Sequence, residues 1–279
     1  MAVADITSFE FSKIADIVYG LTGIHLKDTK KTLVVSRLSR RLKALHLSSF
    51  QEYIQYLTKG NTREREIPEL INSITTNTTE FFREPAHFEY LKNLLPKIWE
   101  EGERKGRRTL RVWCSASSTG EEPYSIAMVL HSFFETKRGW KVKVLASDID
   151  TNVLAVASRG IYRNDKTTGI PIMLRTKYLT QVPGEVPPGH VKISSDIRSM
   201  LVFRKINLIV DPFRFSESVD IIFCRNVVIY FDEVGKQKLV DKFSAVLRSG
   251  GYIFVGHSES LLIQRNTFEF MGNTIYRRI

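Results

Sequence analysis

The segment from residue 75 to 85, TTNTTEFFREP, has an unusual composition for a connection between domains. Amide and hydroxyl side chains are followed by two phenylalanines and an arginine. We expect Phe81 and Phe82 to be buried between two domains. Arg83 beside them would be costly to desolvate without an anionic partner, because a buried charge needs a counter-charge. The segment therefore predicts a site at which Arg83 meets an anionic group.

A second candidate site follows the apolar run 110–114, where the small residues 115–120 lead to Glu121 and Glu122. Small residues let the backbone approach a ligand closely. The spacing differs from GxGxxG, and two acids at a helix N-terminus would repel a pyrophosphate. They suit a ligand with a positive end, such as an amino acid or a sulfonium. The alternative is that both acids only complement the helix dipole.

Two further polar positions follow apolar runs. Asp148 comes about 28 residues after the glycine turn, where an acid accepts hydrogen bonds from a ribose diol. Asp150 competes for this role, but we expect it to cap the next helix. After the run 220–224 come Arg225 and Asn226, and then Tyr230, for which a core position and an active-site hydroxyl both remain open.

These residues need a scaffold, and the hydrophobic periodicity predicts one in two parts. Helix-like segments fill the first 75 residues, at 9–21, 30–47, 50–57 and 63–75. We therefore expect a four-helix domain over 1–75, followed by a linker over 76–90. Between Thr29 and Gln51 the sequence has six Lys/Arg and no Asp/Glu. Without carboxylate partners along the helix, these cations favour an external acidic partner.

Strand-like and helix-like segments alternate from about residue 109, within a domain expected over 91–279. The expected strands are 110–114, 142–146, 220–224 and 252–255, with helices at 122–134, 152–159 and 233–247 and a hairpin at 267–270 and 274–277. Alternation of this kind predicts a parallel α/β sheet with ligands at the carboxyl ends of its strands. Residues 163–206 interrupt it, and we expect a small antiparallel insertion containing strands at 190–193 and 200–203.

Composition narrows the class of protein. The chain has 279 residues, 43% of them hydrophobic, and a net charge of +11. The apolar content excludes general disorder, and no run reaches the roughly 18 apolar residues of a membrane span. The start lacks a basic segment followed by an apolar one, as a secretion leader would have. The two cysteines have no CxxC spacing and fit reduced thiols. For both reasons we expect a cytoplasmic protein.

The histidines lack the spacing of metal ligands, so no metal site is expected. The basic charge predicts an acidic partner, which composition alone leaves open between nucleic acid, anionic lipid and protein.

Six motifs, in order along the chain, together resemble the chemotaxis receptor methyltransferases, the CheR family. They are TTNTTEFFRE, ASSTGEEPYSIA, LASDID, GIYR, FCRNVVIYFD and GHSES. The resemblance implies a Rossmann-like class I S-adenosylmethionine-dependent methyltransferase sheet with an antiparallel β-insertion, preceded by an all-α domain. It also implies a protein-glutamate O-methyltransferase that uses S-adenosyl-L-methionine, releases S-adenosyl-L-homocysteine and forms glutamyl methyl esters on chemoreceptors for sensory adaptation.

The resemblance further assigns residues to roles. The cofactor contacts that it implies are Asn77, Thr79, Arg83, Glu122, Asp148, Asn207, Leu208, Cys224, Arg225 and Asn226. Arg83 and Tyr230 match positions that orient the substrate carboxylate. On the basic helix we expect Arg37, Arg40 and Arg41 to guide docking of the acidic methylation helices in the cytoplasmic region of chemoreceptors.

Several expectations concern partners. We expect a monomer that neither inserts into a membrane nor methylates nucleic acid, because Arg225-Asn226-Val227 replaces the Asp/Asn-Pro-Pro-aromatic motif of amino-directed enzymes. A cofactor-binding sensor without activity is disfavoured by the presence of Arg83 and Tyr230.

The proline-rich stretch 181–190 does not match the loop with which some relatives bind a receptor C-terminal peptide. Cys114 and Cys224 end neighbouring strands, so we expect their sulfur atoms to be close.

Overall fold

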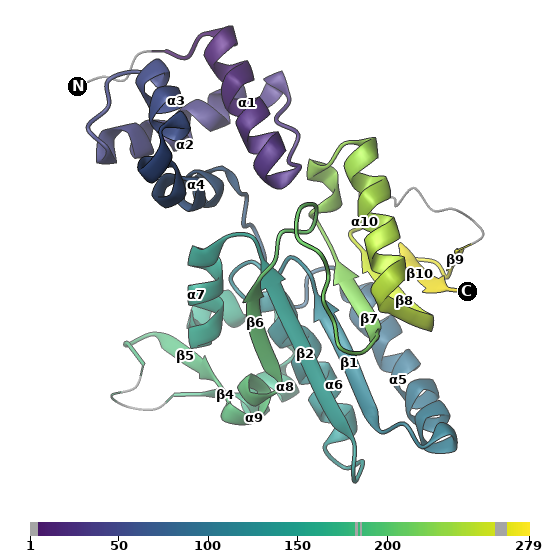
Figure 1. The fold of residues 1–279 in the computed structure, drawn as a ribbon. Helices are drawn as coiled ribbons and strands as arrows, with labels where there is room; N and C mark the ends of the chain where they lie inside the picture. Colours follow the sequence, from purple (N-terminus) through teal and green to yellow (C-terminus); the bar gives the residue numbers. More distant parts are fainter. Residues whose placement is uncertain (1–4, 182–183, 185, 260–266) are drawn as a thin grey trace.

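A computed structural model describes residues 5–181, 184, 186–259 and 267–279. Its helices and strands form a helical N-terminal domain and an α/β domain (Figure 1). Among the described residues, no helix is both long enough and apolar enough to cross a membrane.

Four α-helices form the N-terminal domain, as the periodicity predicts. They are α1 (Ser8–Thr22), α2 (Lys31–Ala44), α3 (Phe50–Thr58) and α4 (Gly60–Ile74), with a short 3-10 turn, η1 (Asp28–Lys30), before α2. Thr7 and Glu10 form a reciprocal capping box at the start of α1. Gly23, with φ 73°, ends α1 in the left-handed region. One apolar face of each helix points into a core that includes Phe11, Ile14, Leu38, Tyr53 and Leu70.

The connection to the second domain is shorter than expected, because α5 (Pro85–Lys105) already begins at Pro85. Phe81 and Phe82 are buried, as predicted, but they pack inside the α/β domain. The ring of Phe81 meets the Tyr162 ring edge-on at 5.0 Å, and the ring of Phe82 lies 4.8 Å from that of Phe88.

A seven-stranded sheet with the order β6-β2-β1-β7-β8-β10-β9 forms the second domain. Its parallel strands are β1 (Thr109–Cys114), β2 (Lys141–Asp148), β6 (Leu201–Lys205), β7 (Val219–Cys224) and β8 (Leu247–Val255). The antiparallel pair β9 (Phe268–Phe270) and β10 (Ile275–Arg278) completes it. The connecting helices are α6 (Glu121–Phe134), α7 (Thr151–Arg159) and α10 (Glu233–Val246). The strand order reverses beside β1, which places a ligand crevice at the carboxyl ends of β1 and its neighbours.

Side-chain alternation divides the sheet into two faces. Cys114 pairs in register with Phe223, and both belong to the core shared with α5 and α6. Cys224 belongs to the opposite core, which contains Phe243 of α10. Because successive side chains of a strand point to opposite faces, the two thiols lie on opposite sides of the sheet. The expectation that their sulfur atoms are close was wrong.

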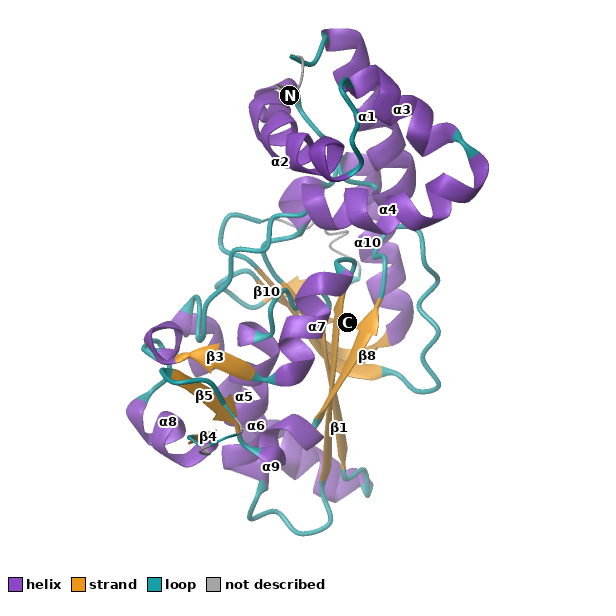
Figure 2. Ribbon diagram, turned by 90° about the vertical axis from the view of Figure 1, so that its left-hand side faces the viewer, coloured by secondary structure: helices purple, strands orange, loops and turns teal. Residues whose placement is uncertain are grey.

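The insertion is a three-stranded antiparallel sheet, β3-β5-β4, beside α7 (Figure 2). It contains β3 (Ile161–Arg163), η2 (Asn164–Thr167), α8 (Ile172–Tyr178), β4 (Leu179–Thr180) and β5 (His190–Ile193), and α9 (Ser195–Ser199) leads out of it. The expected strand 200–203 does not belong here. It forms β6, which pairs in parallel with β2 in the main sheet, so the insertion ends before 201 rather than at 206.

Candidate functional site

A cavity of about 480 Å³ lies where the N-terminal domain, the linker and the carboxyl ends of β1, β2 and β7 meet. Most of the predicted site residues line it, namely Arg37, Asn77, Thr79, Arg83, Glu122, Asp148, Asn207, Leu208, Arg225, Asn226 and Tyr230. Arg40, Arg41 and Cys224 are not among the lining residues. The structure therefore brings together residues as far apart in sequence as Arg37 and Tyr230.

Asp148 ends β2 at the wall of the cavity and is 8% exposed. Its carboxylate accepts hydrogen bonds from the backbone N–H of Ser118, at 2.8 Å, and of Asp150, at 3.0 Å. Burial raises its pKa despite these bonds. Gly120 closes the small-residue turn with φ 102°, and a Cβ atom there would meet the hydroxyl oxygen of Tyr162 at 2.6 Å. The turn therefore needs glycine at this position.

Asp150 is the N-cap of α7, as predicted, and accepts hydrogen bonds from the N–H groups of Asn152 and Val153. Its other oxygen accepts from Asn77 Nδ2 at 2.7 Å and from Thr75 Oγ1 at 2.8 Å. The cap therefore also attaches the linker to the sheet domain. Sequence reasoning missed this second contact, because Thr75 and Asp150 are far apart along the chain.

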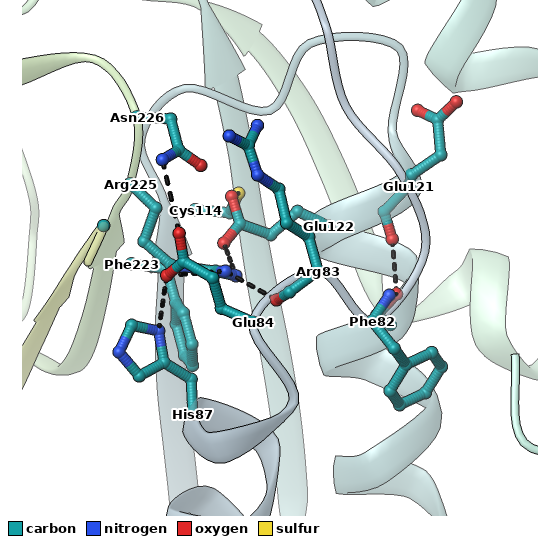
Figure 3. A network of polar contacts seen from close by, with 12 residues as sticks. Phe82, Arg83, Glu84, His87, Cys114, Glu121, Glu122, Phe223, Arg225 and Asn226 are labelled. Atoms are coloured by element: carbon teal, nitrogen blue, oxygen red, sulfur yellow. Dashed lines mark hydrogen bonds and ion pairs between the residues drawn. The ribbon is translucent and has the colours of Figure 1, made fainter. Parts of the chain in front are cut away.

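Arg225 lies at the centre of a buried ionic network and is 4% exposed (Figure 3). Its Nη1 is 2.6 Å from Glu122 Oε1, and its Nη2 is 3.1 Å from Glu84 Oε2. Nη2 also donates a hydrogen bond to the backbone carbonyl of Arg83 at 2.5 Å. The linker segment carrying Arg83 is thus held against the end of β7, while the Arg83 side chain donates to the carbonyl of Thr78 at 3.2 Å.

The turn that carries Tyr230, η3 (Val228–Tyr230), is held from two sides. From the sheet domain, the carboxylate of Glu259 accepts hydrogen bonds from the N–H groups of Gly256 and Asn226, both at 2.7 Å, and of Ile229 at 3.2 Å. Glu259 is 4% exposed, and its burial raises its pKa. From the N-terminal domain, the N–H of His25 donates to the carbonyl of Tyr230 at 2.8 Å. Tyr230 is therefore positioned by both domains.

Asn207 also joins the domains rather than presenting free polar atoms. Its Nδ2 donates to the carbonyl of Leu21 at 2.8 Å, and its Oδ1 accepts from the N–H groups of Ile209 and Val210. Tyr19 adds a further link between the domains by donating to Asp232 Oδ2 at 2.8 Å.

The basic helix has partners that the sequence did not reveal. Arg41 forms a two-pronged ion pair with Glu66 of α4, with both N···O distances 2.7 Å, and Glu66 is 2% exposed. Arg37 donates to the carbonyls of Ile74, at 2.5 Å, and Thr75, at 2.9 Å. The helix offers these cations no carboxylate, but Arg37 and Arg41 have partners elsewhere in the protein and so do not need an external one. Arg40 is exposed.

The cavity combines an acid at the end of β2, a close-approach turn after β1, and an arginine and a tyrosine from outside the sheet. The acid suits a ribose, and the carboxylates suit a cationic ligand end. With the reversal of strand order beside β1, these features define a Rossmann-like S-adenosylmethionine-dependent methyltransferase, here preceded by a helical domain.

Comparison with known proteins narrows this class. Residues 77–277 match the family model described as CheR methyltransferase, SAM binding domain, and residues 10–75 match its all-alpha domain. The chain belongs to the CheR methyltransferase family.

Curated relatives match over almost their whole length. A chemotaxis protein methyltransferase of Borreliella burgdorferi is 40% identical over 98% of this chain and 95% of its own. Chemotaxis protein methyltransferase 2 of Pseudomonas aeruginosa is 38% identical over 97% and 93%. The chemotaxis protein methyltransferase of Escherichia coli is 38% identical over 95% and 89%.

Proposed function

We propose that this protein is a protein-glutamate O-methyltransferase that esterifies glutamate side chains on chemoreceptors in the cytoplasm. The observation that carries the proposal is that Arg83 and Tyr230 line the same cavity as Glu122 and Asp148. One cavity can therefore hold a methyl donor and receive an acidic side chain. The names of the relatives support chemoreceptors as the substrate.

The residues of the cavity fit the donor part by part. Asp148 would accept hydrogen bonds from the ribose hydroxyls, and Asn207 with Leu208 would flank the adenine. Asn77, Thr79 and Asn226 would provide polar contacts from the linker and the end of β7. The carboxylate of Glu122 would face the methionine amino group or the ribose, with Arg225 fixing its orientation. The side chain of Cys224 points into the core on the far face of β7, so we propose that it only supports this wall.

The chemistry needs alignment rather than proton transfer. A glutamate carboxylate is ionised at neutral pH, because its ordinary pKa is about 4.3. Bound S-adenosylmethionine would supply its sulfonium methyl group to the carboxylate oxygen, and the electron pair of the carbon–sulfur bond would remain on sulfur. The guanidinium of Arg83 would hold the incoming carboxylate through charge-assisted hydrogen bonds, and the hydroxyl of Tyr230 would assist. Alignment of this kind contributes several kcal/mol to catalysis.

Docking on the N-terminal domain would use charge. The exposed Arg40 is the best placed of the three predicted docking arginines to attract an acidic receptor helix, since Arg37 and Arg41 are engaged within the protein. We further propose that the enzyme acts as a monomer.

Receptor-bearing membranes incubated with the enzyme and labelled S-adenosylmethionine test this function. We expect the label on receptors as a base-labile ester, and no label on RNA added to the same reaction. Label on RNA that is stable to base, with none on receptors, would instead indicate a nucleic-acid methyltransferase.

A further inference from the structure

Three side chains outside the proposed donor contacts converge behind the Arg225 network. Glu84 and His87 lie at the start of α5, and His257 lies in the turn after β8. Glu84 Oε2 is 3.4 Å from His87 Nδ1 and 3.8 Å from His257 Nε2. Figure 3 shows Glu84 between Arg225 and His87.

The hydrogen bonds of His87 decide which of its ring nitrogens is free. Its Nε2 lies 2.7 Å from the backbone carbonyl oxygen of Asn273. A carbonyl oxygen only accepts, so Nε2 carries the hydrogen. In the neutral ring the lone pair is therefore on Nδ1, which faces the Glu84 carboxylate.

This arrangement leaves two buried acceptors facing each other. Within the described part of the chain, His87 Nδ1 has no hydrogen-bond partner, and the side chain of His87 is 0% exposed. Glu84 Oε2 is paired with Arg225 Nη2 at 3.1 Å, which leaves its second lone pair toward His87 without a donor. Buried polar atoms without partners are rare in folded proteins and point to something that completes them. A cation between the two atoms would complete His87 Nδ1 and bind the second lone pair of Glu84 Oε2.

We propose that Glu84 Oε2, His87 Nδ1 and His257 Nε2 bind one divalent transition-metal ion, with Zn²⁺ the best match. Two imidazoles and one carboxylate are a common zinc ligand set, with a fourth position left for water. The half-exposed ring of His257 leaves a path from solvent.

The residues around the three proposed ligands form the hydrogen bonds that usually hold metal-ligating side chains in place. Ligating histidines donate their other ring N–H to a carbonyl or carboxylate, as His87 does to Asn273. Ligating carboxylates are themselves hydrogen-bonded, and Arg225 Nη2 lies 3.1 Å from Glu84 Oε2. A carboxylate oxygen has two lone pairs and can serve both partners.

The local charge also permits a cation. The carboxylates of Glu84 and Glu122 both contact the single guanidinium of Arg225, which leaves one negative charge uncompensated in this network. A bound ion would also join the start of α5 to the turn that leads to Glu259. We therefore expect the ion to stabilise the protein.

The test uses the full chain without a histidine tag, stripped of metal, and titrated with Zn²⁺ by calorimetry and with Co²⁺ by visible absorption. We expect one equivalent to bind, the Co²⁺ spectrum to show nitrogen and oxygen ligands, and Zn²⁺ to raise the melting temperature. His257→Asn should weaken binding about tenfold or more. His257 is half-exposed, so this variant is expected to fold.

His46→Asn is the matched control, because His46 is exposed on the N-terminal domain and its left-handed backbone (φ 56°) tolerates asparagine. It should bind Zn²⁺ as the unaltered chain does. Absence of binding, or equal affinity in His257→Asn, would overturn the proposal. So would an NMR spectrum of the metal-treated protein with a proton on His87 Nδ1, because a proton shared with Glu84 would then occupy the place of the ion.

Discussion

At the scale of single residues, Arg83 carries the proposed chemistry. Its backbone carbonyl is fixed by Arg225. Within the part of the chain that the structure describes, its half-buried side chain makes one hydrogen bond, to the carbonyl of Thr78. Arg83→Ala should therefore lower the rate of methyl transfer about 100-fold or more, because the substrate carboxylate loses its partner. The melting temperature should change little. Single-turnover kinetics and thermal unfolding measure the two effects, and a near-normal rate would remove Arg83 from the mechanism.

The two cysteines yield a second prediction at this scale. Both thiols are completely buried, and burial raises the pKa of each well above its ordinary value. The thiol form therefore dominates at neutral pH, and the reactive thiolate is scarce. Native protein should react with a thiol reagent only on the timescale of unfolding, whereas denatured protein should release two equivalents. Rapid labelling of native protein would contradict the buried positions.

Sequence patterns identified individual residues well where local spacing carries the information. The choice of Asp150 as the helix cap was confirmed, because a cap is defined by its immediate neighbours. The prediction that the sulfur atoms of Cys114 and Cys224 are close was wrong. The register between β1 and β7 decides which face of the sheet each thiol occupies, and local spacing does not reveal that register. Glu84, His87 and His257 could not be grouped from the sequence, since about 170 residues separate the two ends of the cluster.

At the scale of elements, the turn carrying Tyr230 depends on Glu259. Glu259→Gln replaces one acceptor oxygen by an N–H₂ group that faces a backbone donor. We expect a loss of about 1–3 kcal/mol in the free energy of unfolding. Methyl transfer should slow about tenfold as the turn shifts. Urea unfolding and initial rates measure this, with the exposed Glu269→Gln as the matched control. Equal behaviour of the two variants would show that Glu259 does not hold the turn.

Two arginines of α2 should behave differently. Among the described residues, Arg41→Ala leaves the buried Glu66 carboxylate with the hydroxyl of Tyr53, 2.8 Å away, as its remaining side-chain partner. The variant should therefore lose about 1–3 kcal/mol of stability. Arg40→Ala should change stability by less than about 0.5 kcal/mol. It should slow receptor methylation more at low salt than at high salt, because exposed charges are screened. If the effect of Arg40→Ala did not depend on salt, docking by Arg40 would be refuted.

The elements themselves followed from periodicity. The four N-terminal helices and the strands before Asp148 and Arg225 have long or strongly patterned apolar runs. The strand at 200–203 was assigned to the wrong sheet, because a short apolar run does not show which edge it pairs with. The partner of Arg41 was missed because it lies on another helix.

At the scale of the whole molecule, residues of both domains line one cavity. Figures 1 and 2 show the N-terminal helices at one end of the sheet domain. Tyr19 and Leu21 of α1 contact Asp232 and Asn207 of the sheet domain. The backbone of Ile24 also forms an isolated antiparallel bridge with Phe231. The domain proposed to dock the receptor thus contacts the turn that carries Tyr230. On this proposal, the same contacts would relate a docked helix to the tyrosine.

The central claim is that the donor lies at the carboxyl ends of β1 and β2 with the Arg83 guanidinium beside its methyl group. A crystal structure of the protein with S-adenosylhomocysteine tests this claim most directly. The account predicts the ribose at Asp148, and the sulfur within the cavity on the side of Arg83 and Tyr230. A ligand bound elsewhere, or one with its sulfur remote from both side chains, would contradict it.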